Sequence, residues 1–305
     1  MAVQRRTEPR HDHATFLQTT GHLLAMKRLL HDFPFISLPP ALFIFRIVLA
    51  AVFVGHAAMR LFVPDYFTTA GKLLEANGLP FGFAVAWVVT VVELIGGLLL
   101  VLNKFVKWVA LCFFAISIGT MAFVQYPEGW WVAEFGDGGM EFSFVVCAMC
   151  VFIAAVDRQR QAPYANKYFD AFPYLSVNQG FFVLRVGLAL FFMIHAVTRF
   201  TEPNYFAGLG VGMERFGMPH GYALGVMATT IELVGGTLMI FNRFAKWAAL
   251  GFFGISSMGL AYIHLNLGWY VGEFGSGGCE FSVAICATAL VIAAFDRQAS
   301  QAVSR

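Results

Sequence analysis

Two nearly identical acidic, glycine-rich stretches decide how this chain is organised: EFGDGGMEFS at residues 134–143 and EFGSGGCEFS at residues 273–282. They lie 139 residues apart, and a long apolar run follows each of them. That distance is too long for a solenoid unit of roughly 20–50 residues and suits a whole domain. When the sequence is compared with itself at this shift, residues 41–159 match residues 180–298 without a gap, and 53 of the 119 pairs are identical. The chain is therefore an internal duplication.

The composition excludes most soluble protein classes. Of the 305 residues, 59% are hydrophobic and only 12% are charged, whereas an ordinary soluble domain carries about 25% charged residues. With 34 Phe, the chain has too little polar surface to cover a water-soluble globule, so we expect an integral membrane protein in contact with the lipid bilayer. The net charge of +2 and the lack of a basic patch with interleaved aromatics argue against a nucleic-acid partner.

Each copy of the repeat contains four apolar segments of about 18–22 residues, the length at which a helix crosses about 30 Å of hydrocarbon. The eight segments are residues 41–62, 82–102, 105–126, 138–156, 180–200, 221–241, 244–265 and 277–295. The predicted fold class is an all-α integral membrane protein with eight transmembrane helices, arranged as two parallel-repeat four-helix bundles. Gly-Gly pairs at 96–97 and 235–236 would let neighbouring helices pack closely.

Lysine and arginine indicate the orientation, because cytoplasmic loops are enriched in both. They gather in the N-terminal tail, in the turns at 104–107 and 243–246, in the linker at 158–167 and near the C-terminus. Both termini are therefore expected in the cytoplasm. An even number of spans per copy makes the copies a parallel repeat about the membrane normal. The predicted divisions are a cytoplasmic tail at 1–40, a first unit at 41–159, an interfacial linker at 160–179, a second unit at 180–298 and a tail at 299–305.

Ionisable residues recur inside the apolar segments, where such residues are costly and usually functional. At 1.5 Å per residue, Glu93 of the second span lies at a depth between Arg46 and His56 of the first span. One interpretation is a structural Arg46–Glu93 ion pair. The other is a His56–Glu93 pair that handles protons or anchors a ligand, since imidazole exchanges a proton near neutral pH. The second unit repeats these residues as Arg185, Glu232 and His195.

The opening motif adds acids at the outer mouth of each unit. Glu134 and Asp137 precede the fourth span, where the helix dipole favours carboxylates. Glu141 is expected about three residues inside that span, at the height of Arg60, so a Glu141–Arg60 pair would close the outer end of the bundle. The second unit repeats the two residues as Glu280 and Arg199. The ligand-binding candidates are His56, Arg60, Glu93, Glu141, His195, Arg199, Glu232 and Glu280.

Cysteine and metal chemistry receive little support. Cys147 and Cys150 have CxxC spacing, but the second copy has Cys286 and Ala289, and buried cysteine commonly behaves as a small apolar residue. A redox role for this pair stays an open alternative. No spacing typical of a metal site occurs on a span, so no metal site is predicted and no cofactor is evident from the residues.

The layout resembles the DoxX family of small bacterial membrane proteins. The features that carry the resemblance are four spans per unit, an early Arg and His in the first span, VELIGGLLL at 92–100, a tight turn, and a last span opened by GGMEFS at 138–143. The family name comes from proteins similar to subunits of a membrane thiosulfate:quinone oxidoreductase. The resemblance implies a bacterial inner-membrane protein, a quinone as candidate ligand and a soluble or membrane redox partner. It transfers no catalytic residue.

Three functions remain open from the sequence. The first is the membrane subunit of a redox system that binds a quinone or a similar lipophilic molecule, which leaves open whether the chain is itself part of an oxidoreductase. The second is a binding or transport module for a small solute, and the third is a structural or assembly protein without catalysis. Paired His and Glu residues near the outer half favour the first function, because quinone chemistry involves protons.

Overall fold

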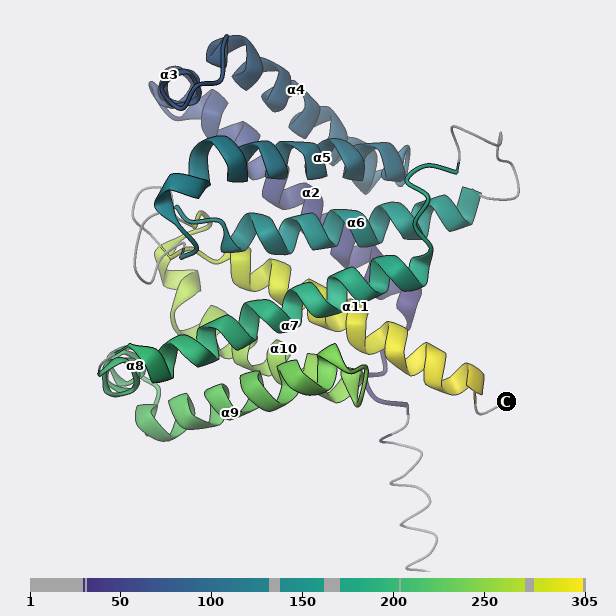
Figure 1. Cartoon of the computed structure of the whole chain (residues 1–305), viewed down its shortest axis with the longest axis vertical. Helices are drawn as coiled ribbons and strands as arrows, with labels where there is room; N and C mark the ends of the chain where they lie inside the picture. The colour runs from purple at the N-terminus through teal and green to yellow at the C-terminus, as the bar shows by residue number, and fades with distance from the viewer. Residues whose placement is uncertain are drawn as a thin grey trace, which may run out of the picture.

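The computed structural model describes residue 30 and residues 32–131, 138–161, 171–202, 204–271 and 277–303. This part of the chain is helical and contains no strand (Figure 1). A long helix lies in each of the eight predicted apolar segments. The first unit contains α2 (Leu38–Phe62), α4 (Gly82–Val101), α5 (Val106–Thr120) and α6 (Glu141–Gln161). The second unit contains α7 (Val177–Thr201), α9 (Gly221–Ile240), α10 (Ala245–Tyr262) and α11 (Glu280–Val303). The all-α prediction is confirmed for the described residues.

Five of the described helices are long and apolar enough to cross a membrane: α2, α4, α7, α9, and α5 with the short π-helical and 3-10 turns that extend it to Glu128. The outward faces of α4 and α9 carry exposed large apolar side chains, among them Val88, Leu98 and Val234. In water such surfaces would be an aggregation hazard, whereas lipid covers them without cost. The protein is therefore a membrane protein whose outer helices contact the bilayer.

Two short helices were not predicted. α3 (Tyr66–Ala76) follows α2, and α8 (Tyr205–Arg215) follows α7, so they occupy equivalent places in the two units. Both lie at the same end of the molecule, on the left in Figure 1, while the α4–α5 and α9–α10 turns lie at the opposite end. α3 rests closely on α4, because a Cβ atom at Gly71 would lie only 3.0 Å from the Cα atom of Phe83.

The two units do not pack as two separate four-helix bundles, which corrects that part of the prediction. α2 packs on α4 of its own unit and on α11 of the other unit, and α7 packs on α9 and on α6. The first helix of each unit makes few contacts with the last helix of its own unit. Successive long helices therefore form a cycle that closes where α11 meets α2. Figure 1 shows α6 and α7 side by side across the unit boundary.

Small residues allow close approach both within and between units. Within the first unit, a Cβ atom at Gly97 of α4 would lie 2.2 Å from Cγ2 of Val54 on α2. Between units, a Cβ atom at Gly187 of α7 would lie 3.1 Å from the Cβ of Ala148 on α6. The Gly-Gly pair at 96–97 thus has the packing role that its position in the sequence indicated.

The equivalence of the two units extends upstream of residue 41, into segments predicted to belong to the tail and the linker. Residues 32–37 precede α2, and residues 171–176 precede α7. The Phe33 ring stacks on Trp247 of the second unit with centroids 6.2 Å apart, and the Phe172 ring stacks on Trp108 of the first at 6.3 Å. Each segment therefore crosses to the other unit. We call the two segments the straps.

An arginine of the opposite unit holds each strap. Arg158, near the end of α6, donates a hydrogen bond of 2.6 Å to the carbonyl of Leu175. Its equivalent in α11, Arg297, donates 2.9 Å to the carbonyl of Asp32 and also contacts the carbonyl of Pro34. The units thus exchange contacts at the end of the molecule opposite α3 and α8.

Candidate functional site

A buried arginine–glutamate pair joins the first two long helices of each unit. In the first unit, Arg60 on α2 forms an ion pair with Glu93 on α4, and its Nε donates 2.8 Å to Oγ1 of Thr90. Arg60 lies four residues after His56, so both side chains lie on the same face of α2. Glu93 is only 3% exposed, and its charge is therefore balanced inside the protein.

The second unit repeats this arrangement in full. The Nη2 of Arg199 lies 3.1 Å from Oε1 of Glu232, and its Nη1 contacts both Oε2 of Glu232 and, at 3.0 Å, Oγ1 of Thr229. A guanidinium that meets both carboxylate oxygens makes a geometrically specific pair. Glu232 is 1% exposed.

The predicted pairs Arg46–Glu93 and Arg185–Glu232 are wrong. Arg46 instead donates to Oδ1 of Asn103 in the α4–α5 turn, and Arg185 donates 3.1 Å to the carbonyl of Ile240. Glu93 lies ten residues before Asn103, or about 15 Å along the helix. The depth estimate failed because it treated the spans as starting and ending at the same level, without the offset that packing introduces.

The histidines pair with glutamates of the other unit. Nε2 of His56 lies 3.3 Å from Oε2 of Glu280, and Nε2 of His195 lies 3.0 Å from Oε2 of Glu141. These pairs replace the predicted His56–Glu93 and Arg60–Glu141 pairs. Each of these histidine–glutamate pairs repeats the other with the two units exchanged, as in an isologous contact.

The glutamates occupy helix N-termini. Glu141 is the first residue of α6 and Glu280 the first of α11, so the expectation that Glu141 lies about three residues inside its helix is wrong. The helix dipole favours a carboxylate at this place. Oε1 of Glu280 also accepts a hydrogen bond of 3.0 Å from the backbone N–H of Val271. Glu134, Asp137 and Glu273 of the motif lie outside the described residues.

An aromatic ring packs against each of the two imidazoles. The Trp131 ring meets the His195 ring edge-on with centroids 4.9 Å apart, and the equivalent Tyr270 lies 5.8 Å from His56. The hydroxyl of Tyr270 donates 3.0 Å to the carbonyl of Gly55.

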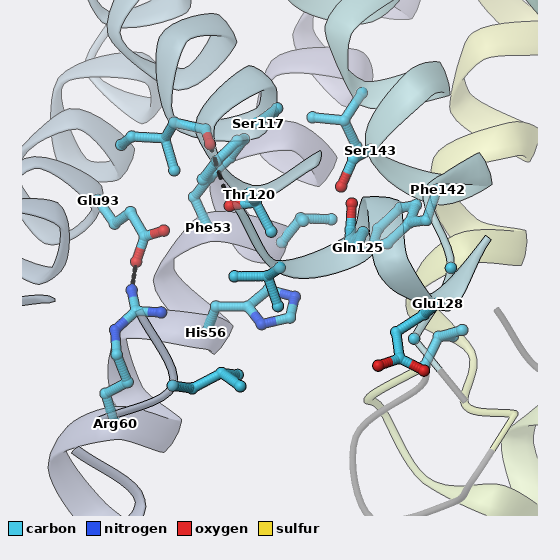
Figure 2. A pocket seen from close by; sticks show the side chains of 18 of the residues that line it. Phe53, His56, Arg60, Glu93, Ser117, Thr120, Gln125, Glu128, Phe142 and Ser143 are labelled. Atoms are coloured by element: carbon cyan, nitrogen blue, oxygen red, sulfur yellow. Dashed lines mark hydrogen bonds and ion pairs between the residues drawn. The ribbon is translucent and has the colours of Figure 1, made fainter. Parts of the chain in front are cut away.

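His56, Arg60 and Glu93 line a cavity of about 400 Å³ in the first unit, at the α3 end of the molecule. Figure 2 shows the His56 ring reaching into this cavity, with the Arg60–Glu93 pair on one side and Gln125 and Ser143 pointing toward one another on the other. The remaining polar lining comes from Ser117, Thr120, Glu128, Tyr66 and Asn77, and the apolar lining includes Val52, Phe53, Ile116, Phe142 and Val146. We call this space the first cavity.

The second cavity has a volume of about 190 Å³ and is built from equivalent positions. His195, Arg199 and Glu232 replace the three ionisable residues of the first cavity, and Glu141 of the first unit also lines it. Further lining residues lie 139 positions after those of the first cavity: Phe191, Phe192, Ile255, Ser256, Gly259, His264, Phe281, Ser282 and Ile285.

The eight ligand-binding candidates thus gather at two equivalent places, whereas Arg46 and Arg185 lie elsewhere. Sequence reasoning missed the hydroxyl residues Thr90, Ser117 and Ser143. A signal for them existed, because each has the same residue 139 positions later. Only ionisable matches were selected, although a buried hydroxyl is also a specific hydrogen-bonding group.

Cys147 and Cys150 are both free and buried on α6. The side chain of Cys286, the equivalent of Cys147, lies 3.5 Å from Oγ of Ser257. Within the described ranges, no group of three or more His, Cys, Asp or Glu side chains is placed to hold a metal ion.

Comparison with known protein families yields two matches to one family, DoxX, at residues 41–126 and 180–265. The chain belongs to the DoxX family. Its two matches confirm the duplication, and both end before the fourth long helix of a unit. In this DoxX protein, the glutamates that cross between units therefore lie outside the matched residues. No curated protein and no solved structure matches the chain.

Proposed function

We propose that this DoxX protein is the membrane subunit of a redox system and binds the ring of a quinone, or a lipophilic molecule of similar size and polarity, in the first cavity. The observation that carries the proposal is His56, which reaches into a cavity of about 400 Å³ while a glutamate of the other unit contacts its Nε2. The proposal includes a bacterial inner-membrane location and a separate soluble or membrane partner that supplies electrons.

The size and lining of the first cavity support this ligand class. Small-molecule sites usually measure roughly 300–1,000 Å³ and combine apolar walls with a few fixed polar groups. Here Phe53, Ile116 and Phe142 offer apolar surface to a ring, while Ser117 offers a hydroxyl to its oxygen atoms. The arginine at this site is already paired with Glu93, so the pocket favours a neutral ligand over an anion.

The His56–Glu280 pair supplies proton chemistry. Reduction of a quinone to a quinol takes up two electrons and two protons, and an imidazole can deliver a proton within hydrogen-bonding distance. A carboxylate on one ring nitrogen fixes the orientation of the ring. Glu280 is fully buried at the start of α11 and is held by the backbone N–H of Val271, so it provides a fixed counter-charge.

We also propose that all eight long helices cross the membrane, as a parallel repeat with both termini in the cytoplasm. α6, α10 and α11 are not among the five helices that length and composition mark as spans. α6 and α11 each begin with a glutamate and carry an Asp-Arg pair sixteen residues later. Their side chains are largely buried among other helices, which removes the need for a wholly apolar surface. A reporter domain fused after residue 305 should be active in the cytoplasm, and activity only in the periplasm would contradict this topology.

Quinone binding can be tested with decylubiquinone, a quinone with a short alkyl tail, on the purified full-length protein in detergent. His56→Gln should weaken binding at least tenfold, because the imidazole contacts the ligand. His220→Gln replaces a histidine that lies before α9, outside both cavities, and should leave binding unchanged. Absence of binding in the unmodified protein would overturn the proposal. Flux of a small solute through the protein in liposomes would then favour a transport module.

A further inference from the structure

We infer that the two cavities differ in function: the first cavity is the ligand site, and Phe191 has narrowed its duplicate so far that the same ligand does not fit. This inference rests on the proposed function, since it assumes that a ligand enters the first cavity. It adds that each chain binds one ligand and that position 52, with its equivalent 191, decides which cavity can receive it.

The clearest difference lies at that position. Val52 lines the first cavity, and Phe191 lines the second. The Phe191 ring lies 4.5 Å from the His195 ring and 4.9 Å from the Phe281 ring, measured between centroids. It therefore packs against the imidazole whose equivalent in the first unit reaches into open space. The volumes of about 400 and 190 Å³ agree with this difference.

A second difference concerns hydrogen bonding. Gln125 lines the first cavity, and its buried Oε1 has no hydrogen-bond partner among the described residues. Its equivalent, His264, has Nδ1 within 2.7 Å of the carbonyl of Gly277. A buried polar atom without a partner is unfavourable, and a bound ligand or water can supply the missing hydrogen bond. The first cavity thus offers an unmet hydrogen bond at the place where the second cavity has satisfied one.

The short outer helices also contribute unequally. Tyr66, Leu73 and Asn77 bring α3 into the wall of the first cavity. Within the described part of the chain, no residue of α8 lines the second cavity. A molecule in the first cavity would therefore touch one aromatic and one amide side chain that have no equivalent contact in the second.

These differences define the ligand. It carries a ring that fits between Val52 and His56, and a hydroxyl or N–H group that can reach the Gln125 amide. A quinol carries both features. In the second cavity the Phe191 ring takes the place of such a ring against His195, so the cavity is occupied by the protein's own side chain.

Equilibrium binding of decylubiquinol, the reduced form of the quinone above, measures how many molecules bind per chain under anaerobic conditions. We expect one per chain in the unmodified protein. Val52→Phe should weaken binding at least tenfold, and Phe191→Val should raise the number from one to two. The double exchange should bind one molecule. Two molecules per chain before any substitution, or full-strength binding in Val52→Phe, would overturn the inference and leave the proposed function standing.

A measurement that needs no ligand separates the claim that the two cavities differ from the claim that the first cavity binds a quinone. In a variant whose five cysteines are replaced, Ser143→Cys and Ser282→Cys place matched thiols in the two cavities; the serines are 8% and 7% exposed. A small methanethiosulfonate reagent should modify the thiol at 143 at least tenfold faster, and Phe191→Val should speed the reaction at 282. Equal rates would overturn the inference. Unequal rates without quinone or quinol binding would retain the inequality of the cavities and reject the proposed ligand.

Discussion

The arginine–glutamate pairs and the histidine–glutamate pairs lie close together at one end of the molecule. The former join helices of the same unit, and the latter join helices of different units. Arg60–Glu93 and Arg199–Glu232 each connect the first two long helices of one unit. The two histidine pairs instead connect the first helix of one unit with the last helix of the other. The first kind of pair stabilises a unit internally, whereas the second makes one structure of both units.

This difference offers a physical reason for the presence of two units in one chain. A single unit contains a histidine on its first helix and a glutamate on its fourth, but the packing does not bring its own two residues together as a pair. Each needs the complementary residue from another unit. The fused chain supplies that residue within the same polypeptide. The straps at the opposite end of the molecule likewise each contact the other unit.

The most severe test of the comparison is to separate the units. Residues 1–170 and residues 171–305, expressed as two chains, should co-purify through a tag on either chain. Expressed alone, each should accumulate at least tenfold less or form a dimer with itself, because Glu141 and Glu280 are buried and lose their partners. Size-exclusion chromatography with light scattering measures the outcome. A single unit that remains a stable monomer would contradict the exchanged packing.

Removing one partner of an internal pair should have the next largest effect. Arg199→Met leaves the charge of Glu232 buried without its partner, which should cost about 3–5 kcal/mol. Adding Glu232→Leu should recover most of this stability, because an apolar pair can replace a buried ion pair. Glu141→Gln, in a cross-unit pair, keeps a hydrogen-bonding group beside His195 and should cost only about 1 kcal/mol.

Unfolding by denaturant in mixed micelles can compare these variants. Equal losses of stability in Arg199→Met and Glu141→Gln would remove the distinction between the two kinds of pair. Failure of Glu232→Leu to recover stability would show that Arg199 acts through contacts other than the ion pair.

Glycine substitutions sharpen the comparison at the level of packing. Gly97→Ala should destabilise by about 1–3 kcal/mol, since the new methyl group would overlap Val54 within the unit. Gly187→Ala, across units, meets Ala148 at 3.1 Å and should cost less. Gly119→Ala has no atom within 4 Å of the new Cβ and should stabilise by about 0.5–1 kcal/mol through helix propensity. The same unfolding measurement gives the order, and a larger loss at 187 than at 97 would reverse our view of where packing is tightest.

The sequence alone determined the duplication, the helical class and the eight apolar segments. These features depend on composition and on matches along the chain. Both can be read from the sequence without knowing which residues meet in space. It also selected His56, Arg60, Glu93 and Glu141 as the residues to examine, because ionisable groups in apolar helices stand out. It missed α3 and α8, whose eleven-residue lengths are too short to appear as spans.

Only the tertiary structure decided which of these residues pair. The two duplicated units contain equivalent histidines and equivalent glutamates, so the sequence cannot distinguish pairing within a unit from pairing between units. The choice of Arg60 over Arg46 as the partner of Glu93 depends on the offset between α2 and α4, which side-chain packing sets. The narrowing of the second cavity likewise depends on where the Phe191 ring points. Pair choice, helix offset and cavity shape are properties of the packed assembly, because each requires groups far apart in the chain to meet in space.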